Sequence, residues 1–237
     1  MASKKMSEEI MLSVIVPMYN TKNIAKNLKA YEFALRKFTD NYEIIAIDDG
    51  STDNCLREAK VVKSDKIKIV SYKKNQGKGN AIKYGFGFAE GRYVGFLDSG
   101  AEFDAKHFEE FLNIMEGENA DVVIGSKRHE QSEVYYPFLR RVMSRCYQLM
   151  NKVLFSLNIR DTQVGIKLFK REVLEKVMPK ILVKKFAYDI EILALANKYG
   201  YKIIEAPIKL EYKFGSTIKL KAIISMFLDT LAVFYRL

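Results

Sequence analysis

YEIIAIDDGSTD, residues 42–53, decides the fold class of this chain. Its first six residues are mostly apolar and indicate a buried strand, and a run of aspartates around a glycine follows at once. Similar short apolar runs recur at residues 12–16, 67–71, 93–97 and 121–125. The run at 12–16 stops at Pro17, and the run at 93–97 stops at Asp98. The pattern predicts a series of buried strands that end in polar loops.

Segments with helical spacing lie between these strands, over residues 24–38, 54–64, 77–90 and 106–115. Strands that alternate with helices pair in parallel, so we predict an α/β fold with a doubly wound, mostly parallel sheet flanked by helices. Ligands bind such sheets beyond the carboxyl ends of the strands. Polar clusters follow these ends at residues 19–20, 48–53, 98–102 and 126–128, which predicts a binding site there.

The second half of the chain is less regular. We predict helices over residues 138–157, 190–199 and 222–234, and strands over 203–208 and 210–213. The first and last of these helices are amphipathic, and the first is basic. We expect one domain over residues 1–237, with a disordered tail at 1–11, a nucleotide-binding half at 12–128 and an acceptor-binding half at 129–237.

Composition and net charge limit the classes of protein to which this chain can belong. The chain has 237 residues, a net charge of +10 and two cysteines, Cys55 and Cys146, which is too few for a disulfide framework. No stretch is apolar enough to span a membrane, and residues 1–11 lack the apolar core of a signal peptide. We expect a cytoplasmic protein. Its basic surface attracts phosphates, whether on nucleotides, nucleic acid or lipid headgroups.

Two acidic loops each follow a predicted buried strand. Asp48, Asp49 and Asp53 surround Gly50, and such carboxylates can accept hydrogen bonds from a base or a ribose. The alternative is a helix cap made by the serine and threonine at 51–52. The second loop, residues 98–102, also presents carboxylates at the same predicted edge. Two acidic loops at one edge repel unless a cation lies between them, and Mg²⁺ or Mn²⁺ suits hard oxygen ligands.

KNQGKGN, residues 74–80, is a basic, glycine-rich turn before a predicted helix. Its backbone N–H groups and lysines could hold phosphate at the start of the helix. The spacing matches neither the P-loop nor the dinucleotide-binding fingerprint. A purely structural turn is the alternative.

Taken together, these motifs resemble glycosyltransferase family 2. The resemblance rests on SVIVPMYN at 13–20, DDGSTD at 48–53 and NQGKGNA at 75–81, in this order. DTQVGIKLF at 161–169 and FAYDIE at 186–191 are similar to two segments of the dolichyl-phosphate glucosyltransferases. The resemblance covers roughly residues 12–236, and several ordered motifs make chance agreement unlikely in a chain of this length.

The resemblance implies a GT-A fold and inverting transfer of a sugar from a nucleotide diphosphate-sugar to a polyprenyl or dolichyl phosphate. The donor it implies is UDP-glucose-like, with GDP-mannose as the other choice. Contacts to the nucleotide-sugar are implied for Pro17, Tyr19, Asn20, Asp48, Asp49, Lys78, Asp98 and Gln163.

The chain departs from the family at its metal motif. The family has Asp-x-Asp followed by a glutamine, whereas this chain has Asp98, Ser99 and Gly100, and Glu102 stands where the glutamine falls. We therefore expect Asp98 and Glu102 to hold Mg²⁺ or Mn²⁺, with water or phosphate completing the site. Lys127 replaces the arginine of the family's Gly-Ser-Arg motif.

The expected catalytic residues are Asp98, Lys127, Arg128 and Asp189. A lipid phosphate is already mostly dianionic near neutral pH, so it needs cations to position it more than it needs a base. Lys127 and Arg128, with the arginines of the 138–157 helix, are available. Asp189 lies near a predicted helix start, where it could cap the helix, bind sugar hydroxyls or act as a base.

Other functions stay open from the sequence. A glycan hydroxyl is the alternative acceptor, although the chain has no Trp and so lacks the QxxRW signature of processive synthases. An inactive nucleotide-sugar or lipid-binding protein is the alternative from another class. We expect no nucleic-acid partner, because carboxylates at the strand ends repel a phosphate backbone. The basic amphipathic helices fit the cytoplasmic face of a membrane or a second copy of the chain.

Overall fold

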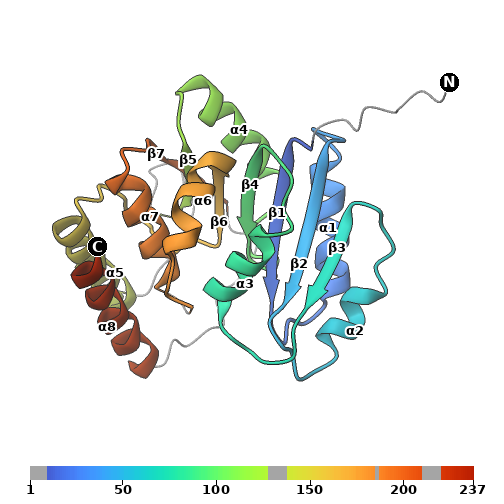
Figure 1. The fold of residues 1–237 in the computed structure, drawn as a ribbon, viewed down its shortest axis with the longest axis horizontal. Coiled ribbons are helices and arrows are strands. Elements are labelled where there is room, and N and C mark those ends of the chain that lie inside the picture. The colour runs from blue at the N-terminus through green and yellow to red at the C-terminus, as the bar shows by residue number, and fades with distance from the viewer. Residues whose placement is uncertain (1–9, 128–137, 185–186, 210–219) are drawn as a thin grey trace.

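A computed structural model describes residues 10–127, 138–184, 187–209 and 220–237. Their core is one seven-stranded sheet in the order β3-β2-β1-β4-β6-β5-β7, with helices on both faces (Figure 1). The strands are β1 Leu12–Met18, β2 Tyr42–Asp48, β3 Ile67–Ser71, β4 Tyr93–Leu97, β5 Val122–Ser126, β6 Ile166–Lys170 and β7 Ile203–Pro207. The helices are α1 Ile24–Leu35, α2 Cys55–Lys60, α3 Lys78–Phe86, α4 His107–Gly117, α5 Phe138–Phe155, α6 Arg171–Val177, the 3₁₀ turn η1 Met178–Lys180, α7 Tyr188–Lys198 and α8 Leu220–Arg236.

The predicted α/β architecture is confirmed in the first half of the chain. Strands β1, β2, β3 and β4 pair in parallel, and β5 pairs in parallel with β7. All seven residues of β1 and of β2 are buried, because helices cover both faces of the sheet. The apolar runs in the sequence are therefore buried strands, as predicted.

Strand β6 is the departure from a purely parallel sheet. It runs antiparallel to both of its neighbours, β4 and β5, and returns the chain between them. The sequence pattern does not predict this strand, because two of its five residues are lysines and its apolar residues neither alternate nor run continuously. The turn that leads into β6 belongs to residues 161–165, so the antiparallel strand carries that motif to the edge where β4 ends.

Helix α3 packs very closely on the sheet. A Cβ added at Gly85 would lie 2.7 Å from Cγ2 of Ile15 and 2.9 Å from Cγ1 of Ile47, so only glycine allows this approach. The close packing fixes α3 against β1 and β2, and the helix begins at Lys78, beside the strand ends.

The expected disordered tail at 1–11 lies mostly outside the described residues. Its last two residues are described and are tied to the sheet, because Arg92 N donates to Ile10 O at 3.0 Å and Met11 N donates to Asn41 O at 2.9 Å. The predicted strand at 210–213 lies outside the described residues.

Helices α5 and α8 lie side by side at one end of the molecule (Figure 1). Tyr147 of α5 contacts the ring of Phe227 and shares a hydrogen bond of 2.9 Å with the hydroxyl of Thr230. The predicted helices at 138–157 and 222–234 are thereby confirmed as a packed pair, with slightly different ends. Among the described residues, no helix is long and apolar enough to cross a membrane.

Candidate active site

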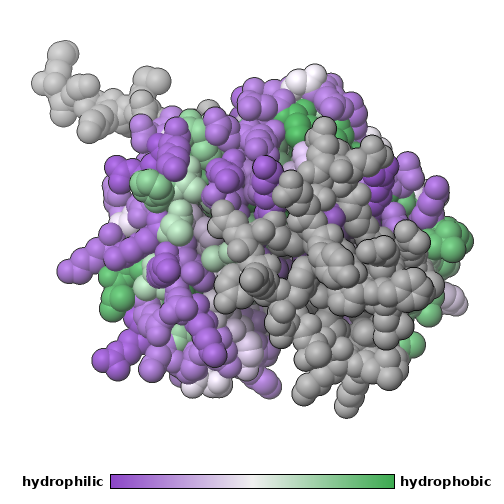
Figure 2. All heavy atoms as spheres, turned by 180° about the vertical axis from the view of Figure 1, so that it is seen from behind, coloured by the Kyte–Doolittle hydropathy of each residue, from purple (hydrophilic) through white to green (hydrophobic). Residues whose placement is uncertain are grey.

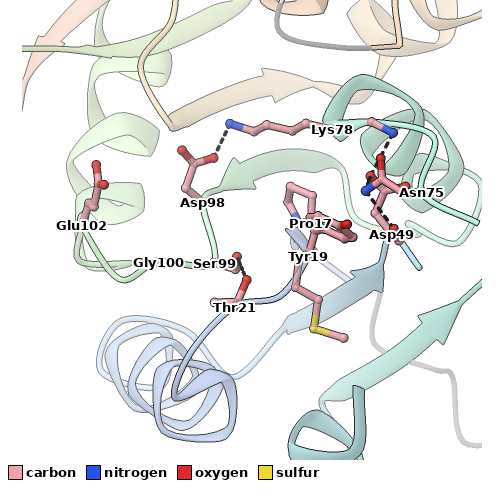
Figure 3. Close-up of a pocket in the computed structure, with 12 residues that line it drawn as sticks. Pro17, Tyr19, Thr21, Asp49, Asn75, Lys78, Asp98, Ser99, Gly100 and Glu102 are labelled. Atoms are coloured by element: carbon pink, nitrogen blue, oxygen red, sulfur yellow. Dashed lines mark hydrogen bonds and ion pairs between the residues drawn. The ribbon is translucent and has the colours of Figure 1, made fainter. Parts of the chain in front are cut away.

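A cavity of about 610 Å³ opens at the carboxyl ends of β1, β2 and β4 (Figure 3). This is the edge at which the sequence predicts a ligand site. The loop after β4 forms one wall, and the turn that begins α3 forms the other. The lining residues are Pro17, Met18, Tyr19, Thr21, Asp49, Asn75, Gly77, Lys78, Asp98, Ser99, Gly100 and Glu102.

Asp49 organises the glycine-rich turn. Its Oδ1 accepts hydrogen bonds of 2.7 Å from the hydroxyl of Tyr72 and from the backbone N–H of Gln76. Its Oδ2 accepts from the side chain of Asn75 at 3.0 Å and from the N–H of Gly77 at 2.9 Å. Four donors on one carboxylate fix the turn in front of α3, so Asp49 joins two motifs that the sequence treats separately.

Tyr72 is a residue of this network that sequence reasoning missed, because it looks like the end of an ordinary strand. Burial raises the pKa of its hydroxyl, and a hydrogen bond from Asn80 opposes that effect while Asp49 adds to it. Tyr72 therefore stays a neutral donor to Asp49 throughout the physiological pH range.

Asp48 is buried and is not among the described residues that line the cavity. Its Oδ2 accepts from the N–H of Ser51 at 3.2 Å, and its Oδ1 has no hydrogen-bond partner among the described residues. A buried carboxylate oxygen without a partner is costly. The nucleoside contact expected for Asp48 stays a prediction.

Asn20 links the loop after β1 to the loop after β2. Its backbone N–H donates to Ser51 Oγ at 3.0 Å, and its Oδ1 accepts from Thr52 N at 2.9 Å. Helix α2 begins after Asn54 without a side-chain cap from the serine and threonine, so the helix-cap alternative is not what these residues do. Tyr19 and Pro17 line the cavity, whereas Asn20 supports the loop, and the nucleotide contacts expected for these residues stay predictions.

Helix α1 supports the loop after β4 through hydrogen bonds made by two of its side chains. The hydroxyl of Tyr31 donates to Asp98 O at 2.8 Å and accepts from Ala101 N at 2.9 Å. Asn27 donates to Ser99 O at 2.8 Å. Sequence reasoning missed both side chains, since they fall within an ordinary amphipathic helix. They fix the backbone that presents Asp98 to the cavity.

Lys78 forms an ion pair with Oδ1 of Asp98 across the cavity (Figure 3). Burial favours the neutral form of Lys78, but the carboxylates of Asp98 and Asp189 outweigh it, so the pKa of Lys78 is raised above its ordinary value. The ammonium also lies 5.8 Å from the ring centre of Tyr188. Lys78 therefore stays protonated and carries a positive charge at the position where the sequence predicts phosphate binding.

The backbone also shapes the surroundings of Asp98. Asp98 N donates to Gly165 O at 2.9 Å, and a Cβ at Gly165 would lie 2.2 Å from Oδ2 of Asp98. Glycine is therefore required at position 165 for Asp98 to keep its place. This contact joins the 161–169 motif to the cavity.

The two expected metal ligands do not converge on one point. Asp98 and Glu102 both line the cavity, but their carboxylates lie apart from each other, and Asp98 contacts Lys78 (Figure 3). Among the residues that the structure describes, no three His, Cys, Asp or Glu side chains form a metal-binding group. Mg²⁺ is commonly held by one or two carboxylates together with phosphate oxygens of a ligand. The residues present fit that kind of site.

Asp189 forms a buried ion pair that the sequence does not reveal. Its Oδ1 lies 2.5 Å from Nζ of Lys167, and Nζ also donates to Val164 O at 2.5 Å. Both side chains are almost completely buried, and Asp189 is not among the described residues lining the cavity. The pair ties α7 to the turn before β6 and so supports Gly165 beneath Asp98.

Glu191 also has a structural role. Its carboxylate accepts from the N–H groups of Leu182 and Val183, the latter at 2.8 Å, and pairs with Arg236 of α8. Because Lys184 O in turn accepts from Gly79 N at 2.8 Å, this segment braces the start of α3. Glu191 is thus a support of the site.

The remaining predicted residues either do not line this cavity or lie outside the described residues. Lys127 N donates to Asp161 Oδ2 at 3.3 Å, and its ammonium lies 5.2 Å from the ring centre of Phe103. Gln163 lines a separate cavity of about 30 Å³ between α5 and the 161–165 turn. Arg128 lies outside the described residues, as do the side chains of the three α5 arginines.

Comparisons with known proteins agree with the motifs. Residues 13–178 match the family Glycosyl transferase family 2. A dolichyl-phosphate beta-glucosyltransferase of Dictyostelium discoideum is 32% identical over 87% of this chain and 68% of the relative. The enzyme of the same name from Saccharomyces cerevisiae is 31% identical over 90% of this chain and 70% of its own length.

Solved structures share the fold. Glucosyl-3-phosphoglycerate synthase of Mycobacterium tuberculosis, crystallised with Mn²⁺, UDP and phosphoglyceric acid, superposes with a TM-score of 0.72 at 18% identity over 95% of this chain and 78% of that chain. Mannosyl-3-phosphoglycerate synthase of Rubrobacter xylanophilus superposes with the same TM-score at 13% identity, over 96% of this chain and 73% of that one. The predicted GT-A fold is confirmed by these neighbours.

Proposed function

The chain belongs to glycosyl transferase family 2 and is a glycosyltransferase, and on that basis we propose that it transfers glucose, with inversion, from UDP-glucose to a polyprenyl phosphate. The relatives' names supply the sugar and the class of acceptor. The observation that carries the proposal is the convergence of three motifs on one cavity. Asp49 and the turn at 75–78 meet Asp98 there, at the carboxyl edge of the sheet.

The donor is proposed to lie across this cavity. Pro17 and Tyr19 line the end near Asp49, where the base and ribose would bind. The diphosphate would lie near Lys78, since the ammonium and the start of α3 both favour negative charge. With the donor present, Asp98 would hold Mg²⁺ or Mn²⁺ together with the phosphate oxygens, and the cation would neutralise charge on the leaving diphosphate. The presence of Mn²⁺ or Mg²⁺ with UDP in the structural neighbours supports a divalent cation.

The chemistry of the acceptor favours a phosphate. An oxygen of a dianionic lipid phosphate attacks the anomeric carbon, the bond from that carbon to the diphosphate breaks, and UDP leaves with the bonding electrons. A hydroxyl acceptor would require a base to remove its proton. Asp189, the candidate base, is buried and already paired with Lys167. That pairing is the specific observation that weighs against a glycan hydroxyl as acceptor.

Cations beside the cavity would position the acceptor phosphate. We propose Lys127 for this role, since it follows β5 and its backbone N–H donates to Asp161. We propose the same role for its neighbour Arg128. The division into a donor half at 12–128 and an acceptor half at 129–237 follows from this assignment and is part of the proposal.

We also propose that a lipid surface meets the α5–α8 end of the molecule. Exposed apolar side chains lie one or two turns apart on each helix, and Tyr235 is 95% exposed. In Figure 2 this end lies on the right, and hydrophobic residues reach the surface there, whereas the described surface on the left is mainly hydrophilic. The exposed apolar residues described at this end are Leu149, Val153, Leu228, Leu231, Phe234 and Tyr235. Such a face suits an acceptor carried in a membrane.

A donor panel tests the proposal. The purified chain is incubated with a short-chain polyprenyl phosphate, Mg²⁺ or Mn²⁺, and radiolabelled UDP-glucose, UDP-galactose or GDP-mannose in separate reactions. Label is then counted in the organic phase. We expect label from UDP-glucose that depends on the lipid phosphate and disappears in Asp98→Ala. Intact UDP binding with no label from any donor would contradict the proposal and favour an inactive nucleotide-binding protein.

A further inference from the structure

Asp98 already has a cationic partner within the fold. Lys78 reaches it from the first residue of α3, on the opposite wall of the cavity (Figure 3). Both side chains are partly exposed to the cavity, 24% for Lys78 and 34% for Asp98. The Lys78–Asp98 ion pair is therefore accessible to a ligand that enters the cavity, whereas the Lys167–Asp189 pair is buried.

The loop after β4 offers few side-chain ligands to a cation other than Lys78. Gly100 stands at the third position of that loop and has no side chain, and even a Cβ added there would have only Glu102 Cγ nearby, at 4.0 Å. The carboxylate of Glu102 lies apart from that of Asp98, and only Asp98 is joined to Lys78 (Figure 3). A divalent cation bound by the protein alone would therefore depend mainly on the single carboxylate that Lys78 occupies.

An ammonium and a divalent cation cannot both contact the same carboxylate oxygen without strong repulsion. The cation requires an oxygen at about 2.0–2.1 Å for Mg²⁺, which would place two or more positive charges side by side. We propose that Lys78 is an exchangeable counter-ion of Asp98: it excludes a divalent cation before the nucleotide binds and moves to the donor diphosphate when the nucleotide arrives. This inference rests on the proposed donor site. It adds to that site the property that cation binding depends on bound nucleotide.

The surroundings of Lys78 permit such an exchange. Its ammonium is 5.8 Å from the ring centre of Tyr188, so a small rotation keeps the ammonium over an aromatic face. The backbone at the start of α3 is meanwhile fixed, because Asp49 holds Gln76 and Gly77 while Gly79 N bonds to Lys184 O. The side chain can change partner while its helix stays in place.

Binding of Mn²⁺ to the full chain, followed by the electron paramagnetic resonance of the free ion, tests the exchange. We expect Lys78→Met and Lys78→Gln to bind Mn²⁺ without nucleotide at least about tenfold more tightly than the wild type, a change of about 1.4 kcal/mol. We also expect UDP to improve Mn²⁺ binding by a smaller factor in these variants than in the wild type. Asp98→Asn in the Lys78→Met background should remove the gain.

Lys22→Met is the matched control. Lys22 is exposed beside the cavity residue Thr21, and its loss lowers the net charge by the same amount. If the Lys22 variant gains as much Mn²⁺ affinity as the Lys78 variants, the effect is one of general charge and the inference is wrong. Unchanged Mn²⁺ affinity in both folded Lys78 variants, with normal UDP binding, overturns the exchange alone. Absence of both UDP and Mn²⁺ binding in every variant overturns the donor site as well.

Discussion

Replacing Lys167 with methionine removes the positive half of the buried pair and keeps a side chain of similar length. The lysine side chain is 3% exposed and that of Asp189 is 6% exposed. Breaking a buried pair leaves the other charge without a partner, which typically costs about 3–5 kcal/mol. For a chain of this size we expect the melting temperature to fall by about 6–20 °C.

Lys170→Met is the matched comparison on the same strand. Lys170 also forms an ion pair, with Asp121 at 2.8 Å, but their side chains are 26% and 21% exposed. Solvent screens such a pair, so its loss should cost about 0–1 kcal/mol. The contrast between the two variants isolates burial, since residue type and strand are shared.

Thermal and guanidinium unfolding of both variants, with the double variant Lys167→Met/Asp189→Asn, measures the difference. We expect the double variant to recover a large part of the loss, because two neutral side chains replace an unpaired buried charge. A Lys167 variant no less stable than the Lys170 variant would refute the reasoning, and the 161–165 turn would then need another support.

Three further outcomes follow from the site. Asp49→Ala removes the acceptor of four hydrogen bonds, so UDP affinity measured by calorimetry should fall about tenfold or more; unchanged affinity would exclude an ordering role for Asp49. Gly165→Ala places a methyl 2.2 Å from Oδ2 of Asp98, so kcat should fall about 100-fold while the fold persists; a fully active variant would contradict the close contact. Burial opposes ionisation of Asp121, but hydrogen bonds from Lys170 and Lys202 outweigh burial and lower the pKa of Asp121. The contribution of this carboxylate to stability is therefore present above about pH 4 and is lost as the pH falls below that value. Asp121→Asn should therefore reduce the fall in the guanidinium midpoint between about pH 4 and pH 2.5, and an identical pH profile would count against it.

Much of the fold follows from local patterns. Continuous apolar runs bounded by polar loops predict β1, β2 and β4, because strands covered on both faces need apolar side chains at nearly every position. The position of the cavity follows from the same rule, since parallel strands bring their carboxyl ends to one edge. Residues in loops at that edge, such as Asp49, Lys78 and Asp98, are therefore within reach of sequence reasoning.

What the pattern cannot predict depends on contacts between distant segments. Lys167 looks like a solvent-facing lysine in a short strand, and only the approach of α7 makes it a buried partner of Asp189. Tyr31 looks like core of α1, and only the packing of α1 under the loop after β4 reveals its two hydrogen bonds. The ion pair between Lys78 and Asp98 likewise depends on the antiparallel return of β6, which brings Gly165 against Asp98.

The nature of the acceptor is the central claim, and a comparison of two lipids tests it most directly. The chain is given radiolabelled UDP-glucose with a polyprenyl phosphate or with the free polyprenol of the same length, under identical detergent and cation conditions. We predict a labelled lipid product from the phosphate and none from the alcohol. Equal transfer to the alcohol, or transfer only to a glycan hydroxyl added in their place, would contradict the claim.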